Sequence, residues 1–71
     1  MKTLNSILYS GKYIGWKIRD VLEKDPDYIY DLYLHDSDFD LYRDVIIELE
    51  KKGYRMKKAI LEKIKLLQKK N

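Results

Sequence analysis

The chain has 71 residues, a formal net charge of +3 and no cysteine. This length allows one domain with a modest core, and the lack of cysteine excludes disulfides, a thiolate nucleophile and zinc sites built on cysteine. With 45% hydrophobic and 38% charged residues, the composition is typical of a soluble globular protein and not of a disordered chain. No apolar run is long enough for a signal peptide or a membrane span, so we expect a cytoplasmic protein without a membrane partner.

Residues 6–18 predict a short β-hairpin. Every second residue along 7–13 falls on one prospective face, which suits a strand with one packed side. Gly15 can adopt the positive φ of a tight turn. Because the β-branched Ile14 precedes it, a type II turn with Gly15 in the third position is favoured.

The same stretch could suggest a phosphate-binding loop, because it combines two glycines with lysines. A P-loop needs Gly-x-x-x-x-Gly-Lys-Ser/Thr between a buried strand and a helix. Here only three residues separate Gly11 from Gly15, and Ile18 rather than Ser or Thr follows Lys17. The turn interpretation is therefore preferred.

Four helices are predicted after the hairpin, over residues 18–24, 26–35, 38–52 and 54–69. Asp25 can cap the second helix with Pro26 at its first position. Ser37 with Asp40 resembles a capping box for the third, and Gly53 suits the position just after that helix ends. The fold class expected is therefore α+β: a short N-terminal β-hairpin followed by three to four helices in a single small domain.

Helical spacing also predicts which side chains are buried. On the third helix the buried stripe is expected to comprise Phe39, Tyr42, Val45, Ile46 and Leu49. On the fourth it is expected to comprise Met56, Ile60, Ile64 and Leu67.

Charge is strongly segmented along the chain. Residues 1–18 carry +3, residues 19–50 carry three basic and eleven acidic side chains, and residues 51–71 carry nine basic side chains against Glu62 alone. Such asymmetry indicates either a partner of one sign or two segments of the chain that face each other. The sequence leaves both interpretations open.

The stretch GKYIGWKIRDVLEKDPDYIYDL, residues 11–32, resembles the short module at the C-terminus of exodeoxyribonuclease X-like proteins and of small quorum-sensing-regulated factors. The matching residues are Gly11, Lys12, Tyr13, Gly15, Ile18, Asp25, Pro26, Tyr28, Ile29 and Leu32. The departures are Ile14 and Trp16, where lysines are usual, and Asp31, where the family has tryptophan. The resemblance implies a β-hairpin with helices and a role associated with nucleic acid. It implies no catalytic residues, because the nuclease chemistry of such proteins lies in a separate domain.

The basic C-terminal helix predicts a function in binding phosphates. The candidate nucleic-acid-binding residues are Lys12, Lys17, Arg55, Lys57, Lys58, Lys63 and Lys65, and Lys69 and Lys70 extend the basic run. The competing interpretation is a solvated basic face that balances the acidic middle of the chain. We expect a non-enzymatic module without a cofactor that binds DNA or RNA, or a protein that processes them, such as an accessory protein of a phage or mobile element.

An alternative function is a protein-interaction or inhibitor module. Its acidic docking residues would be Asp27, Asp31, Asp38, Asp44 and Glu48. A calcium site at Asp36, Asp38 and Asp40 is disfavoured, because Leu41 stands where an EF-hand loop needs glycine. His35 is the only histidine, so no metal set or catalytic dyad can be built on histidine; we expect it to flank the end of the second helix.

Overall fold

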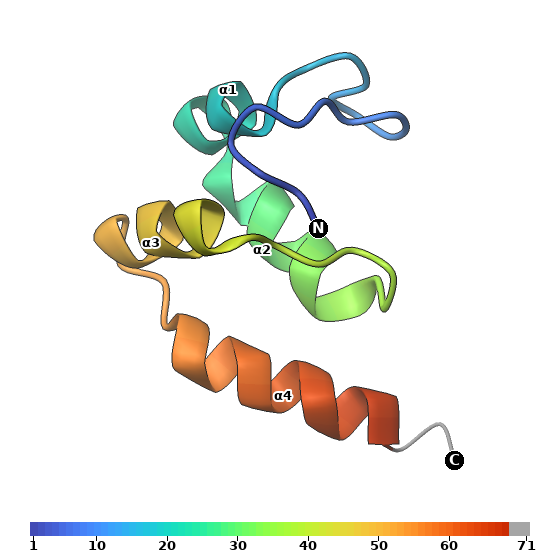
Figure 1. The fold of residues 1–71 in the computed structure, drawn as a ribbon, viewed down its shortest axis with the longest axis vertical. Helices are drawn as coiled ribbons and strands as arrows, with labels where there is room; N and C mark the ends of the chain where they lie inside the picture. The colour runs from blue at the N-terminus through green and yellow to red at the C-terminus, as the bar shows by residue number, and fades with distance from the viewer. Residues whose placement is uncertain (69–71) are drawn as a thin grey trace.

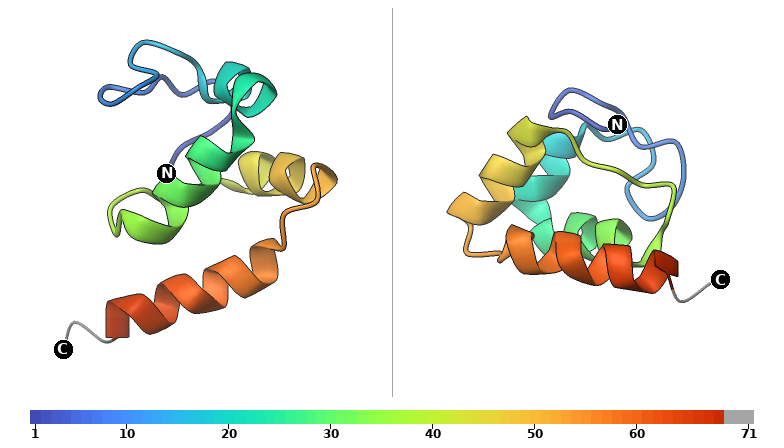
Figure 2. Two further views of the ribbon diagram at one scale, coloured as in Figure 1. Left: turned by 180° about the vertical axis from the view of Figure 1, so that it is seen from behind. Right: turned by 60° about the horizontal axis from the view of Figure 1, so that its bottom comes forward.

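The structure is a computed structural model that describes residues 1–68. An irregular N-terminal segment precedes four helices, which are α1 (Ile18–Lys24), α2 (Pro26–His35), α3 (Arg43–Lys51) and α4 (Met56–Gln68) (Figure 1). Helices α2 and α3 each pack against both α1 and α4. As a result, α1 and α4 lie on opposite sides of the molecule, with α2 and α3 between them (Figures 1 and 2).

The predicted α+β class is wrong, because the described part of the chain is helical and contains no β-strand. The expected hairpin is reduced to one antiparallel bridge between Ile7 and Lys17. Two backbone hydrogen bonds frame it: the Leu8 N–H donates to the Trp16 carbonyl at 2.9 Å, and the Ile18 N–H donates to the Ser6 carbonyl at 2.8 Å.

A positive φ of 87° at Gly11 explains why the pairing stops. An extended strand needs negative φ at every residue, so residues 7–13 cannot form the one continuous strand that the sequence predicted, and the pairing does not extend beyond Leu8. The predicted tight turn is present. Gly15 has a φ of 85°, and the Trp16 N–H donates to the Tyr13 carbonyl at 3.0 Å, as a type II turn with Gly15 in the third position requires.

The boundaries of α1 and α2 are those that the sequence indicates. Asp25 is the N-cap residue of α2 and Pro26 occupies its first turn, where a missing N–H costs nothing. The Asp25 side chain does not cap the helix, however. Its carboxylate accepts a hydrogen bond from the Tyr13 hydroxyl at 3.0 Å.

Helix α3 begins at Arg43 and not at residue 38, so the predicted capping box of Ser37 and Asp40 does not exist. The backbone before it is instead paired with the N-terminus in an isolated parallel bridge between Lys2 and Leu41. The Lys2 N–H donates to the Asp40 carbonyl, and the Tyr42 N–H donates to the Lys2 carbonyl, both at 2.8 Å. The pairing with Lys2 therefore keeps the residues just before Arg43 extended, so they cannot form part of the helix.

The end of α3 follows the prediction. Gly53 has a φ of 98° and comes two residues after the last residue of the helix. Its N–H donates to the Glu50 carbonyl and the Tyr54 N–H donates to the Leu49 carbonyl, which together form a Schellman motif. This motif turns the chain from α3 into α4.

The core draws on every helix and on the N-terminal segment. Its buried hydrophobic residues are Leu8, Tyr13, Ile18, Val21, Leu22, Ile29, Tyr33, Phe39, Leu41, Val45, Leu49, Met56 and Ala59. Two predicted core residues are wrong: Tyr42 is 53% exposed and Ile64 is 46% exposed. Ile46 and Ile60 pack at the edge of the core, and the side chain of Leu67 lies outside the described part.

Candidate nucleic-acid interface

Residues of the Gly-Lys-Tyr motif fix the N-terminal segment to the start of α2. The Tyr28 hydroxyl accepts a hydrogen bond from the Lys12 backbone N–H at 3.2 Å, and a Cβ atom at Gly11 would overlap that hydroxyl. The rings of Tyr13 and Tyr28 meet edge to face with centroids 4.9 Å apart. Burial and the hydrogen bond to Asp25 raise the pKa of the Tyr13 hydroxyl above its usual value. These residues therefore have a structural role that does not require a ligand.

The Lys12 side chain is directed toward the protein. Its ammonium lies 4.0 Å from a carboxylate oxygen of Asp25 and 5.4 Å from the centroid of the Tyr13 ring. Lys17 is exposed and is the N-cap residue of α1. Residues 10–17 form the upper end of the molecule in Figure 1, whereas α4 forms the lower end. Because the two segments lie at opposite ends of the longest axis, Lys12 and Lys17 do not join the basic helix in one site.

Four basic side chains are exposed at or just before α4. They are Arg55, Lys57, Lys58 and Lys65, and we call them the basic face. None of them forms an ion pair with any residue in 1–68. Lys69 and Lys70, which extend the basic run in the sequence, lie outside the described residues, as does the predicted end of the helix at residue 69.

Helical geometry places the basic face away from the protein. The buried residues of α4 are Met56, Ala59 and Lys63, which share the side that meets α2 and α3. Lys57 and Lys65 are eight residues apart on the opposite side, with Leu61 midway between them and 60% exposed.

Lys63 must be removed from the predicted binding set, because it is only 5% exposed. Its ammonium donates to the Phe39 carbonyl at 2.5 Å and to an Asp40 carboxylate oxygen at 3.1 Å. It also lies 4.2 Å from the centroid of the Tyr33 ring. Burial, and the nearby negative charge of Asp40, raise the pKa of the Tyr33 hydroxyl above its usual value. Lys63 therefore joins α4 to α2 and to the segment before α3.

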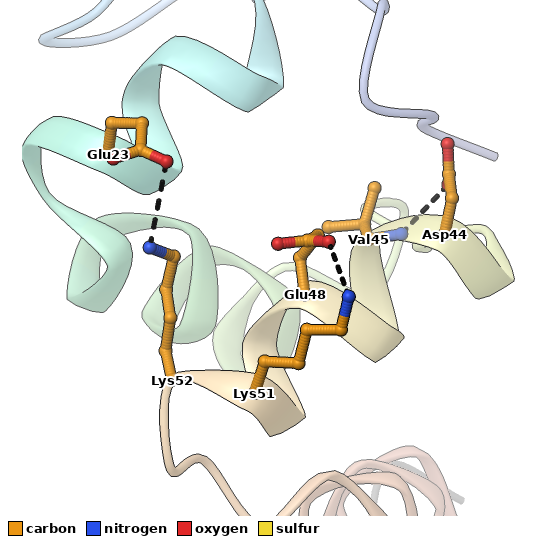
Figure 3. Close-up of polar contacts among 6 residues, drawn as sticks. All are labelled: Glu23, Asp44, Val45, Glu48, Lys51 and Lys52. Atoms are coloured by element: carbon orange, nitrogen blue, oxygen red, sulfur yellow. Dashed lines mark hydrogen bonds and ion pairs between the residues drawn. The ribbon is translucent and has the colours of Figure 1, made fainter.

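Three of the five acidic candidates are already used within the fold. Asp27 accepts a hydrogen bond from the Tyr54 hydroxyl, and this bond raises the pKa of Tyr54 to about 12. Asp44 accepts from the backbone N–H groups of Leu4 and Val45, at 3.1 and 2.8 Å. Glu48 pairs with Lys51 at 3.4 Å (Figure 3).

The other two acidic candidates, Asp31 and Asp38, are exposed. Their side chains form no hydrogen bond or ion pair with a residue in the described range. The five candidates therefore do not form one free acidic surface.

A groove of about 270 Å³ lies between α1 and α3 and carries both signs of charge. Arg19 and Lys52 line it together with three carboxylates, those of Asp20, Glu23 and Glu48. Lys52 reaches across to Glu23 at 4.0 Å (Figure 3). Because three carboxylates face two cations, this groove is not a basic site for an anion.

Residues 1–68 contain no group of three or more carboxylate and histidine side chains placed to hold a metal ion. Two of the three carboxylates in residues 36–40 are engaged with other groups: Asp36 accepts from the Asp38 backbone N–H at 3.0 Å, and Asp40 pairs with Lys63. His35 lies in the last turn of α2, where the sequence indicated. No helix in the described range is both long and apolar enough to cross a bilayer.

Sequence reasoning missed a second groove, which runs along α2. Tyr28, Leu32 and Asp36 follow one another at intervals of four residues, and hollows of about 310 and 330 Å³ share all three as walls. The first hollow also contacts Tyr9 and Asp38, and the second contacts Asp31 and His35. The spacing was visible in the sequence, but residues 8–11, which close one side, are brought there only by the fold.

No protein-family model matches the chain, and no curated protein or solved structure matches it significantly. The resemblance to the exodeoxyribonuclease X-like module therefore stays a prediction based on the motif in residues 11–32.

Proposed function

We propose that the chain binds the phosphate backbone of a nucleic acid through the basic face of α4, as a module that performs no catalysis itself. The observation that supports this proposal is the presence of four exposed cations at one helix without a carboxylate partner among the described residues. Unpaired lysine and arginine side chains gathered on one element are the usual electrostatic footprint of phosphate binding.

The spacing of the lysines suits a nucleic-acid strand. Lys57 and Lys65 are eight residues apart, which corresponds to about 12 Å along a helix axis. A single strand of a duplex carries one phosphate per about 3.4 Å of its axis, so this length spans three to four phosphates. The contacts are to the backbone, so the proposal predicts little dependence on base sequence.

The direct test is the salt dependence of binding to a short labelled DNA duplex, a DNA single strand and an RNA. If four phosphates of the duplex are neutralised, the slope of log K against log salt should be about −3.6, and affinity should fall about 150-fold between about 50 and 200 mM salt. The triple variant Lys57→Gln, Lys58→Gln, Lys65→Gln should reduce the steepness of that slope by about 2.7.

A matched control removes the same charge from the other end of the molecule. The variant Lys12→Gln, Lys17→Gln, Lys24→Gln should keep nearly the full affinity, because these exposed lysines lie in or before α1, on the opposite side of the molecule from α4. Binding that does not depend on salt, or that is weakened equally by both triple variants, would contradict the proposal.

The acidic protein-docking alternative is less well supported. Asp27, Asp44 and Glu48 are engaged with Tyr54, the N-terminal backbone and Lys51. An inhibitor that mimics a nucleic-acid backbone needs a continuous free acidic surface, and within residues 1–68 only Asp31 and Asp38 of the predicted set have no side-chain partner.

A further inference from the structure

Two surfaces of opposite charge have no ion-pair partner within residues 1–68. One is the basic face of α4. The other is the groove along α2, which we call the α2 groove and define by Tyr9, Tyr28, Asp31, Leu32, Asp36 and Asp38. Leu32 gives it an apolar wall, and none of its three carboxylates forms an ion pair with a residue in 1–68.

The α2 groove already accommodates one ammonium group. The Lys2 side chain lines the same hollow as Tyr9, and its ammonium lies 5.2 Å from the centroid of the Tyr9 ring. Tyr9 is 78% exposed, so most of its ring remains accessible. Aromatic faces beside carboxylates are a favourable environment for lysine and arginine side chains.

We propose that the α2 groove binds the basic face of α4 from a second copy of this chain. The pattern on α4 is lysine, leucine, lysine at Lys57, Leu61 and Lys65, with the leucine exposed between the charges. The groove offers the matching groups, because Asp31 lines one of its two hollows, Asp38 lines the other, and Leu32 lines both. Docking would bury Leu61 against Leu32 and pair the lysines with the aspartates.

The contact must join two copies rather than two parts of one. Within a copy, α4 meets α2 through its buried side, which carries Met56, Ala59 and Lys63, so its basic face is directed away from α2. Because one copy offers the helix and the other offers the groove, the contact is head-to-tail, and a bound pair leaves the groove of the first copy and the helix of the second copy free. Association can then extend beyond a dimer.

Sedimentation velocity on nucleic-acid-free protein tests the proposal without depending on the proposed function. At about 0.05 M salt and loading concentrations up to about 1 mM, the weight-average mass should rise to at least twice the 8.6 kDa of one chain. At about 0.5 M salt it should return to the mass of one chain, because exposed charge pairs are screened. A mass of 8.6 kDa at every concentration and both salt levels would overturn the proposal.

Charge reversal identifies the two surfaces. The variant Asp31→Lys, Asp38→Lys and the variant Lys57→Glu, Lys65→Glu should each stay at the mass of one chain, and their mixture should associate again. One chain with all four changes should also associate, at the unchanged net charge of +3. Asp20→Lys, Glu50→Lys is the matched control for the first variant and should associate like the wild type.

Circular dichroism spectra and melting temperatures near those of the wild type would show that each variant is folded. If neither the mixture nor the quadruple variant recovers association, the pairing of groove and helix is wrong. The proposal is equally overturned if the Asp20→Lys, Glu50→Lys control is as defective as the groove variant. Nucleic-acid binding by the same samples, measured separately, supports or contradicts the proposed function by itself.

Discussion

Replacing Lys63 by methionine should destabilise the fold although it removes a buried charge. Methionine keeps a flexible stem of similar length, so packing on Tyr33 is largely retained. What is lost is the donor to the buried Phe39 carbonyl, at 2.5 Å, and a hydrogen bond from a charged donor contributes about 1.5–3 kcal/mol. The paired Asp40 side chain is 57% exposed, so its ion pair adds at most about 1 kcal/mol.

Part of that loss is offset because a thioether is cheaper to bury than an ammonium ion. We therefore expect the free energy of unfolding to fall by about 2 kcal/mol, which for a domain of this size lowers the melting temperature by about 8–16 °C. Urea unfolding followed by circular dichroism would measure the change, with an unaltered m-value showing that both states keep their compactness.

Two companion variants test whether the hydrogen bond to the Phe39 carbonyl accounts for this loss of stability. Asp40→Asn should cost less than about 1 kcal/mol, because water can solvate the side chain. Lys65→Met, at an exposed position on the same helix, should change stability by no more than about 0.5 kcal/mol. If Lys63→Met is as stable as the wild type, or if Asp40→Asn costs as much as Lys63→Met, the bond to the Phe39 carbonyl is not the main contribution.

Three other predictions concern the N-terminal turn and the start of α4. Gly11→Ala should lower the free energy of unfolding by about 2 kcal/mol, because the new Cβ atom would sit at a φ of 87° and overlap the Tyr28 hydroxyl. In a Tyr28→Phe background this cost should be smaller, and a double-mutant cycle would measure the difference. Gly15→Val should cost more than about 1 kcal/mol from backbone strain alone, because a Cβ atom there meets no other atom within 4 Å, and an unchanged melting temperature would disprove the turn assignment. Since its hydrogen bond to Asp27 raises the pKa of Tyr54 from its ordinary value to about 12, the folded state holds this proton more tightly. The resulting stability is fully present below about pH 10 and is lost as the pH rises through 12, so unfolding measured from pH 9 to 12 should show a smaller decline for Tyr54→Phe than for the wild type.

Features that depend on neighbouring residues could be read from the sequence. Pro26 sets the start of α2, Gly53 ends α3, and Gly15 forms the tight turn, because each of these depends on the backbone preferences of one or two residues. Helical periodicity likewise placed Lys57 and Lys65 on an exposed side of α4.

Features that depend on residues far apart in the chain were decided only by the tertiary structure. The hairpin fails because the chain bends at Gly11, beside the Tyr28 hydroxyl, and α3 starts late because Lys2 pairs with the backbone before it. From the sequence, Lys63 is expected to belong to a solvated basic face. In the structure it is buried, because the Phe39 carbonyl and Asp40 accept hydrogen bonds from its ammonium group. Local patterns carry no information on whether such a partner will be within reach, since packing of the whole chain determines that distance.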